Sequence, residues 1–196
     1  MKIKKILEQL ENKNNTPFPN YENTLLESLN VLKKEEQHSN FIYWVLTEIR
    51  IKKDESILLK EIIKKFKLVT PKQPPRIIER EKSSTTGRVD IYIEWDNYKL
   101  LLENKILSSE NDKQCKAYLE DFEIDENKKN GCLIYLSPSG RTPTSIINDK
   151  RIIVANYYEF LTLLENVVEK LQLQKEKKFE KHQYLINDYI LSIKRI

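Results

Sequence analysis

Two carboxylates and a lysine lie close together in the sequence, on two segments in which apolar and polar residues alternate. Asp90 belongs to the segment 89–94, while Glu103 and Lys105 belong to the segment 98–106. Side chains alternate between the two faces of a strand, so Glu103 and Lys105 are expected on the same face. If the segments pair, the two carboxylates converge, and hard divalent cations prefer such oxygen ligands. The same spacing also fits an ordinary solvated strand face that carries alternating charges.

Two neighbouring features add to this pattern. Asp96 and Asn97 separate the two segments and tolerate a positive φ, which predicts a two-residue hairpin turn. The preceding stretch 64–88 contains eight Lys or Arg and only two Glu, although the net charge of the whole chain is only +4. Lysine and arginine supply phosphate contacts without reading base sequence, so this basic approach favours a polyanionic substrate. A solvated, lysine-rich surface is the alternative.

The composition restricts the class of protein. A chain of 196 residues with 39% hydrophobic and 33% charged residues is expected to form one globular domain, neither disordered nor embedded in a membrane. Cys115 and Cys132 lack the spacing of a zinc site or a disulfide framework, so reduced thiols are expected. The N-terminal stretch has no apolar run of signal-peptide length. We therefore expect a cytoplasmic protein.

The periodicity of the apolar residues predicts an α/β protein with a mixed central sheet and a helical N-terminal region. The expected strands are 76–81, 89–94, 98–106, 132–136 and 151–156. The expected helices are the first fifteen or so residues, a region from Tyr21 to Leu32, 41–51 capped by Ser39 and Asn40, 57–66, 112–122, one that follows residue 156, and 179–196. These elements divide one domain, 1–196, into a mainly helical part (1–70), an α/β core (76–168) and a C-terminal helix (169–196).

The order of the charged residues resembles the core of the PD-(D/E)XK nuclease superfamily. The residues that carry the resemblance are Asp90, the run Glu103-Asn104-Lys105, and Gln114 and Tyr118 four apart on the following helix. The upstream run Glu35-Glu36-Gln37-His38-Ser39 is similar to the E-x-x-H-S segment of a branch of largely uncharacterised bacterial members. Val89 stands where the superfamily's name places proline. The resemblance spans roughly residues 25–160.

The resemblance implies a restriction-endonuclease-like αβββαβ core and a set of site residues. Asp90 and Glu103 would ligate Mg²⁺ or Mn²⁺ together with the backbone carbonyl of Asn104, and Lys105 would position the attacking water. Glu35 would be an additional acid. The remaining pair, Gln114 and Tyr118, would contact the scissile phosphate or support Lys105.

The implied function is metal-dependent hydrolysis of phosphodiester bonds, with DNA as the expected nucleic-acid partner. The alternatives are a catalytically silent module of the same fold that binds nucleic acid or a protein partner, and a helical interaction protein with an incidental charged hairpin. His38 is expected to be satisfied by a local hydrogen bond, with contact to substrate as the alternative. The amphipathic C-terminal helix fits either a homodimer interface or packing within one chain.

Overall fold

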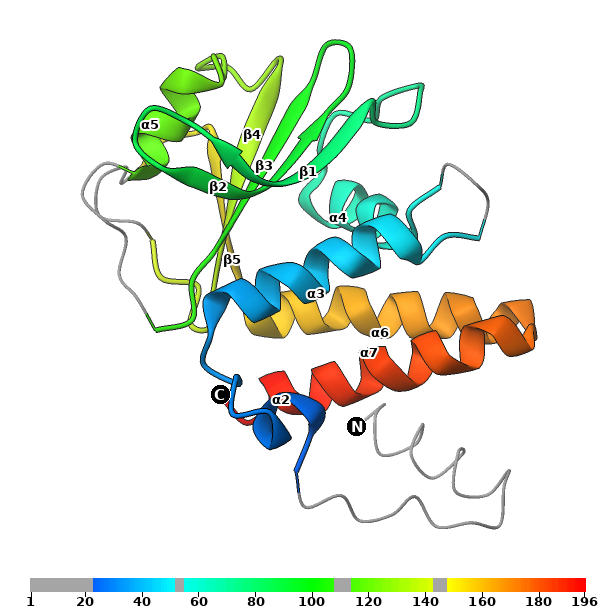
Figure 1. The fold of residues 1–196 in the computed structure, drawn as a ribbon. Coiled ribbons are helices and arrows are strands. Elements are labelled where there is room, and N and C mark those ends of the chain that lie inside the picture. The colour runs from blue at the N-terminus through cyan, green and yellow to red at the C-terminus, as the bar shows by residue number, and fades with distance from the viewer. Residues whose placement is uncertain (1–22, 52–54, 108–113, 143–147) are drawn as a thin grey trace, which may run out of the picture.

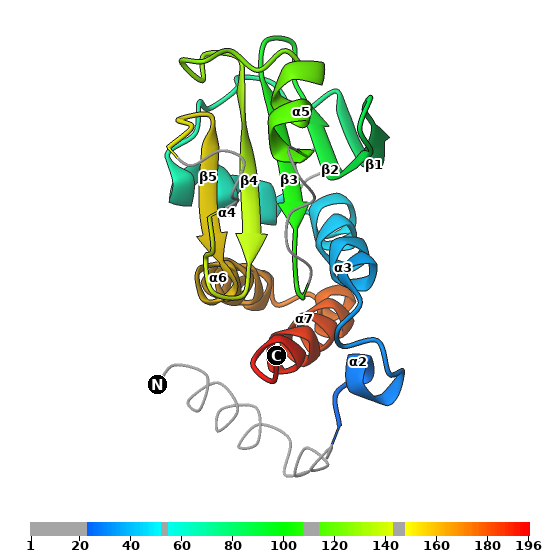
Figure 2. The ribbon, with the colours of Figure 1, turned by 90° about the vertical axis from the view of Figure 1, so that its left-hand side faces the viewer.

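The computed structural model describes residues 23–51, 55–107, 114–142 and 148–196. Within these ranges the chain forms a five-stranded mixed sheet whose strands lie side by side in sequence order (Figure 2). The strands are β1 (Ile77–Ser83), β2 (Arg88–Glu94), β3 (Lys99–Asn104), β4 (Gly131–Ser137) and β5 (Ile152–Asn156). The pairs β1–β2 and β2–β3 are antiparallel, whereas β3–β4 and β4–β5 are parallel. The predicted α/β class with a mixed sheet is confirmed.

Helices cover both faces of the sheet (Figure 1). They are α2 (Leu25–Ser28), α3 (Glu35–Glu48), α4 (Ile57–Phe66), α5 (Gln114–Asp121), α6 (Tyr157–Gln174), the short 3₁₀ helix η2 (Lys177–Phe179) and α7 (Glu180–Ile193). α5 lies on one face of the sheet, and α3, α4 and α6 lie on the other, with α7 packed against α6 and α2. The helix α6 continues across position 168, so it joins the sheet to the C-terminal part of the chain.

The two faces of the sheet belong to separate hydrophobic cores. Ile91, Leu100 and Leu102 pack with α3, α4 and α6 in the larger core. Leu101 packs with the α5 residues Cys115 and Tyr118 in the smaller one. The segment Leu100–Leu102 is apolar on both faces because β3 is covered on both sides. The strand that carries Glu103 and leads to Lys105 is therefore packed from above and below.

Two predicted helix boundaries were wrong. α3 begins at Glu35 rather than at residue 41, and Ser39 lies inside it, where its hydroxyl donates to the carbonyl of Glu35 at 3.1 Å. The acids Glu35 and Glu36 suit the first turn of a helix because its N-terminus carries partial positive charge. Of the region from Tyr21 to Leu32, the described residues form only the four-residue α2, which ends at Ser28, two residues before Asn30 adopts a φ of 55°. The helix predicted for the first fifteen residues lies outside the described residues.

The predicted hairpin forms with the two expected turn residues, but their backbone conformation is not the expected one. Glu94 pairs with Lys99 and the Trp95 amide donates to the Tyr98 carbonyl at 2.8 Å, which leaves Asp96 and Asn97 in the turn. Neither turn residue has a positive φ, so the predicted positive φ was wrong.

None of the helices within the described residues is long and apolar enough to span a membrane.

Candidate active site

Asp90 replaces a main-chain contact between β2 and β3 with its side chain. Backbone pairing of the two strands runs from Glu94 and Lys99 to Ile91 and Leu102, and the next opposed residues in this register are Asp90 and Glu103. At that point the carboxylate Oδ2 of Asp90 accepts a hydrogen bond from the amide of Asn104 at 2.7 Å. This bond fixes the position of the Asp90 carboxylate beside the end of β3.

The strand alternation breaks at the same place. Val89 was expected on the face of Ile91 and Ile93, but it packs in the core under α5, whereas Ile91 and Ile93 face α3 and α4. The alternation prediction was therefore wrong for Val89. A strand whose ladder is interrupted by a side chain is free to change its pleat there, which leaves Asp90 at the boundary between the two faces.

Glu103 and Lys105 share one face, as predicted from their spacing, and form a close ion pair. The ammonium of Lys105 lies 2.8 Å from Oε1 of Glu103, whose side chain is only 2% exposed. The second oxygen, Oε2, is buried and has no hydrogen-bond partner among the described residues. A buried carboxylate oxygen without a partner costs free energy unless something else satisfies it.

Glu35 comes to the same place from the first turn of α3. Its Oε1 accepts hydrogen bonds from the amides of Ile106 at 2.9 Å and Leu107 at 3.2 Å, just after β3. Its Oε2 lies 3.9 Å from the Lys105 ammonium. The structure thus brings the expected additional acid next to Lys105, across a long separation in sequence.

Burial and like charges control the protonation of this cluster. Burial raises the pKa of Glu103, and repulsion from the Asp90 carboxylate raises it further. Burial also raises the pKa of Asp90, against the hydrogen bond from the Asn104 amide. Burial alone would lower the pKa of Lys105, but the carboxylates of Glu103, Glu35 and Asp90 outweigh it and raise that pKa. The site therefore holds a protonated lysine among carboxyl groups that resist ionisation.

Gln114 and Tyr118 lie beside the site, where they contact each other and β2. The Gln114 amide donates to the Tyr118 hydroxyl at 2.6 Å, and that hydroxyl donates to the carbonyl of Arg88 at 2.7 Å. Tyr118 is fully buried, and burial together with the nearby Glu103 raises its pKa. The pair thereby ties α5 to the residue two positions before Asp90.

A buried network behind Asn104 was not predicted. The Asn104 amide group donates to Ser39 Oγ at 3.2 Å and to the Glu35 carbonyl at 3.3 Å, and its Oδ1 accepts from the hydroxyl of Tyr157. Tyr157 is the first residue of α6, directly after the end of β5. The sequence signals that helix start through the N-cap Asn156, but it contains no local sign that Tyr157 reaches Asn104.

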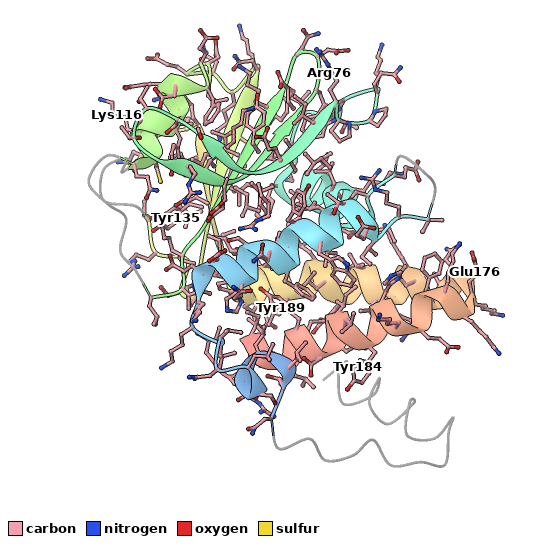
Figure 3. The ribbon with its side chains drawn as sticks, viewed as in Figure 1. Arg76, Lys116, Tyr135, Glu176, Tyr184 and Tyr189 are labelled. Atoms are coloured by element: carbon pink, nitrogen blue, oxygen red, sulfur yellow. The ribbon has the colours of Figure 1, made fainter. Side chains whose placement is uncertain are left out.

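His38 is buried, and both of its ring nitrogens have partners within the fold. It is fully buried, with Nε2 2.7 Å from the Leu32 carbonyl and Nδ1 3.0 Å from the Tyr189 hydroxyl, and burial lowers its pKa. Tyr189 of α7, labelled in Figure 3, also stacks on Phe41 of α3 with ring centroids 3.8 Å apart. The expected local hydrogen bond of His38 is present, to the carbonyl of Leu32. The second hydrogen bond, to Tyr189, links α3 to α7.

The residues of the site fit a hard divalent cation. Asp90 and Glu103 supply two carboxylates, and Glu103 Oε2 needs a partner. Among the residues that the structure describes, no three His, Cys, Asp or Glu side chains gather closely enough to form a metal cage of their own. A cation such as Mg²⁺ does not require one, because it keeps several waters and uses one or two carboxylates.

A mixed sheet that carries an acid on its second strand and a Glu-x-Lys pair on its third, followed by a helix and a parallel strand, is a restriction-endonuclease-like core. A family model described as "PD-(D/E)XK nuclease superfamily" matches residues 24–190. The chain therefore belongs to the PD-(D/E)XK nuclease superfamily, and a nucleic-acid substrate and divalent-metal dependence are typical of that class. No curated protein and no solved structure matches the chain. The narrower E-x-x-H-S branch stays a prediction.

Proposed function

We propose that this protein is an Mg²⁺- or Mn²⁺-dependent nuclease that hydrolyses phosphodiester bonds in DNA. One observation carries the proposal: Glu103 is buried beside Asp90 with one oxygen on the Lys105 ammonium and the other without a partner in the described chain. A purely structural ion pair has no need of a second, half-buried carboxylate next to it. A cation-binding site does, because the ion offsets the repulsion between the two groups.

Asp90 and Glu103 would hold the ion with the backbone carbonyl of Asn104. When bound, the ion would supply Lewis acidity toward the phosphate and lower the pKa of a coordinated water. The hydrogen bond from the Asn104 amide to Asp90, at 2.7 Å, keeps the carboxylate of Asp90 aimed before any ion arrives. Such preorganisation lowers the cost of assembling the site.

Lys105 would orient the attacking water and offset the charge that grows on the phosphate oxygens. The carboxylates around it raise its pKa, so the ammonium stays protonated at neutral pH and does not serve as the general base. Glu103 at 2.8 Å and Glu35 at 3.9 Å restrict where that ammonium can point. Glu35 would act as a positioning residue, because its Oε1 already binds two backbone amides.

Gln114 and Tyr118 would also act by positioning. The Tyr118 hydroxyl uses its proton on the Arg88 carbonyl, so in this arrangement it has none left to donate to a phosphate. Tyr118 would hold the start of β2, and with it Asp90, against α5. Gln114 would keep the hydroxyl in that orientation.

Incubation with labelled single- and double-stranded DNA and RNA, with Mg²⁺, Mn²⁺ or EDTA, tests the proposal. We expect metal-dependent cleavage of DNA that falls about a hundredfold or more in Asp90→Asn, which keeps an oxygen for the Asn104 amide, and in Lys105→Ala. Glu94→Gln, on the same strand beyond the site, is the matched control and should cleave normally. Cleavage that persists unchanged in Asp90→Asn and Lys105→Ala would refute the proposal.

A further inference from the structure

A recess lies at the end of the sheet opposite the candidate active site. It is a groove of about 880 Å³ between the end of α3, the helix α4, the segment 70–76 and the adjoining ends of β1 and β2. Arg76, labelled in Figure 3, precedes β1 and contributes to its wall. Ile78 of β1 and Trp95, which follows β2, form part of its floor. None of the candidate catalytic residues lines this groove.

The charged residues among those that line the groove are mainly cations. Arg50, Lys60, Lys72 and Arg76 face it, whereas Glu55 is the one acidic residue in its lining. Lys60 pairs with Glu55 at 2.7 Å, and Arg76 lies 3.5 Å from Asp96, but all four side chains of these pairs are largely exposed. Exposed ion pairs contribute little free energy and exchange readily for other partners. An anionic ligand would therefore meet a net positive surface.

One cation, Arg80 of β1, lies between the groove and the candidate active site. On β1, Ile78 lines the groove and Arg80 follows two residues later on the face toward α3, where it donates to Asn40. The charge of Arg80 acts on the Asp90 carboxyl. Trp95 directly follows β2 and is five residues from Asp90 in the sequence, which is roughly 16 Å at the rise of a strand. The groove and the candidate active site are thus a few nucleotides apart along β2.

We infer that the groove binds an unpaired stretch of the substrate strand that flanks the scissile phosphodiester. Lys72 and Arg76 would contact backbone phosphates, and the half-buried ring of Tyr43, which lines the groove, offers a face for a base. The volume is that of a small-ligand site, which is large enough for a few nucleotides of an unpaired strand and too small to enclose a double helix. This inference rests on the proposed nuclease function and adds that the enzyme prefers a single-stranded flank.

The test measures the anisotropy of a fluorescein-labelled single-stranded DNA oligonucleotide in EDTA, where binding is separate from cleavage. We expect Lys72→Glu/Arg76→Glu to bind about tenfold more weakly or worse. For this variant, the slope of log K against log salt should be less steep by about 1.4, because two phosphate contacts are lost and each contact to a single strand contributes about 0.7. Lys129→Glu/Lys178→Glu carries the same charge change on exposed lysines outside the groove and should stay within about twofold of wild type. Lys72→Arg/Arg76→Lys should restore binding.

Equal affinities in the two charge-reversal variants would overturn the inference. The inference would also be overturned if Lys72→Glu/Arg76→Glu lost binding of a free nucleoside monophosphate but kept its affinity for the oligonucleotide. The groove would then hold a small molecule instead of a strand. Cleavage by wild-type protein in Mg²⁺ is scored separately. If wild-type protein cleaves DNA but the two charge-reversal variants bind equally well, only the groove inference is overturned. If binding depends on the groove but no cleavage occurs, the groove inference is supported and the proposed nuclease function is overturned.

Discussion

Glu103 lies in an unfavourable environment for a carboxyl group that must ionise. Its side chain is 2% exposed, it is repelled by Asp90, and one of its oxygens has no partner among the described residues. The ion pair with Lys105 compensates for only part of that cost. Folded proteins accept such unfavourable groups mainly where function requires them.

The protonation of these carboxyls predicts how metal-free protein responds to pH. Folding raises the pKa of both Asp90 and Glu103, so the folded state binds more protons than the unfolded chain. Their contribution to stability is complete at or below about pH 4 and is lost as pH rises toward neutrality and beyond, by about 1–3 kcal/mol. Mg²⁺ should restore most of that loss.

Thermal unfolding at pH 5 and pH 8, with Mg²⁺ or EDTA, measures this effect. The rise in Tm on adding Mg²⁺ should be larger at pH 8 and should disappear in Glu103→Gln. A rise of equal size at both pH values, or one that survives in Glu103→Gln, would place the bound ion elsewhere.

At the scale of the elements, Asn104 is where α3, β3 and α6 meet. It bonds to Ser39 and the Glu35 carbonyl on α3 and to Tyr157 on α6, while its backbone amide holds Asp90. Three elements that are distant in sequence therefore support one carboxylate. Loss of any of these bonds should therefore change the position of the Asp90 carboxylate.

Tyr157→Phe tests this connection. It leaves the buried Oδ1 of Asn104 without the hydroxyl, which should cost about 1–3 kcal/mol of unfolding free energy and lower kcat more than KM. Tyr158→Phe removes the same hydroxyl from the neighbouring side chain, which is 81% exposed, and should change neither quantity. Urea denaturation and steady-state cleavage supply the two readouts. An unchanged kcat in a destabilised Tyr157→Phe would reduce the network to a purely structural one.

The sequence could predict those features that depend on local pattern. Strand alternation predicted that Glu103 and Lys105 share one face, and the expected two-residue turn correctly predicted the pairing of β2 with β3. Local pattern does not predict the face of Val89, because a side-chain bond from Asp90 interrupts the ladder there. Local pattern also does not predict the contact of Tyr157 with Asn104, because tertiary packing alone brings the hydroxyl to a residue 53 positions away. The start of α3 was misplaced because its acidic first turn looks like a break in an apolar pattern.

At the scale of the whole molecule, the apolar face of α7 is covered by the chain itself. Ile186, Tyr189, Ile190 and Ile193 are buried in the larger core against α6 and α3. This arrangement matches packing within one chain, which was one of the two uses expected for the C-terminal helix. A homodimer remains a prediction and would have to use another surface.

Ile190→Ala distinguishes the two uses of α7. A buried isoleucine shortened to alanine should cost about 2–5 kcal/mol of unfolding free energy, and it should not shift the mass seen by light scattering. Tyr184→Ala, on the same helix at a position that is 44% exposed, should cost much less. Dissociation of a dimer in Ile190→Ala without loss of unfolding free energy would contradict packing within one chain.

The most direct measurement compares the rate of DNA cleavage in Mg²⁺ by wild-type protein, Glu103→Gln and Glu94→Gln. If Glu103 and Asp90 hold the ion, Glu103→Gln loses about a hundredfold or more in rate while its Tm in EDTA is maintained or rises, and Glu94→Gln matches wild type. Equal Mg²⁺-dependent rates in all three proteins would contradict the assignment of the active site.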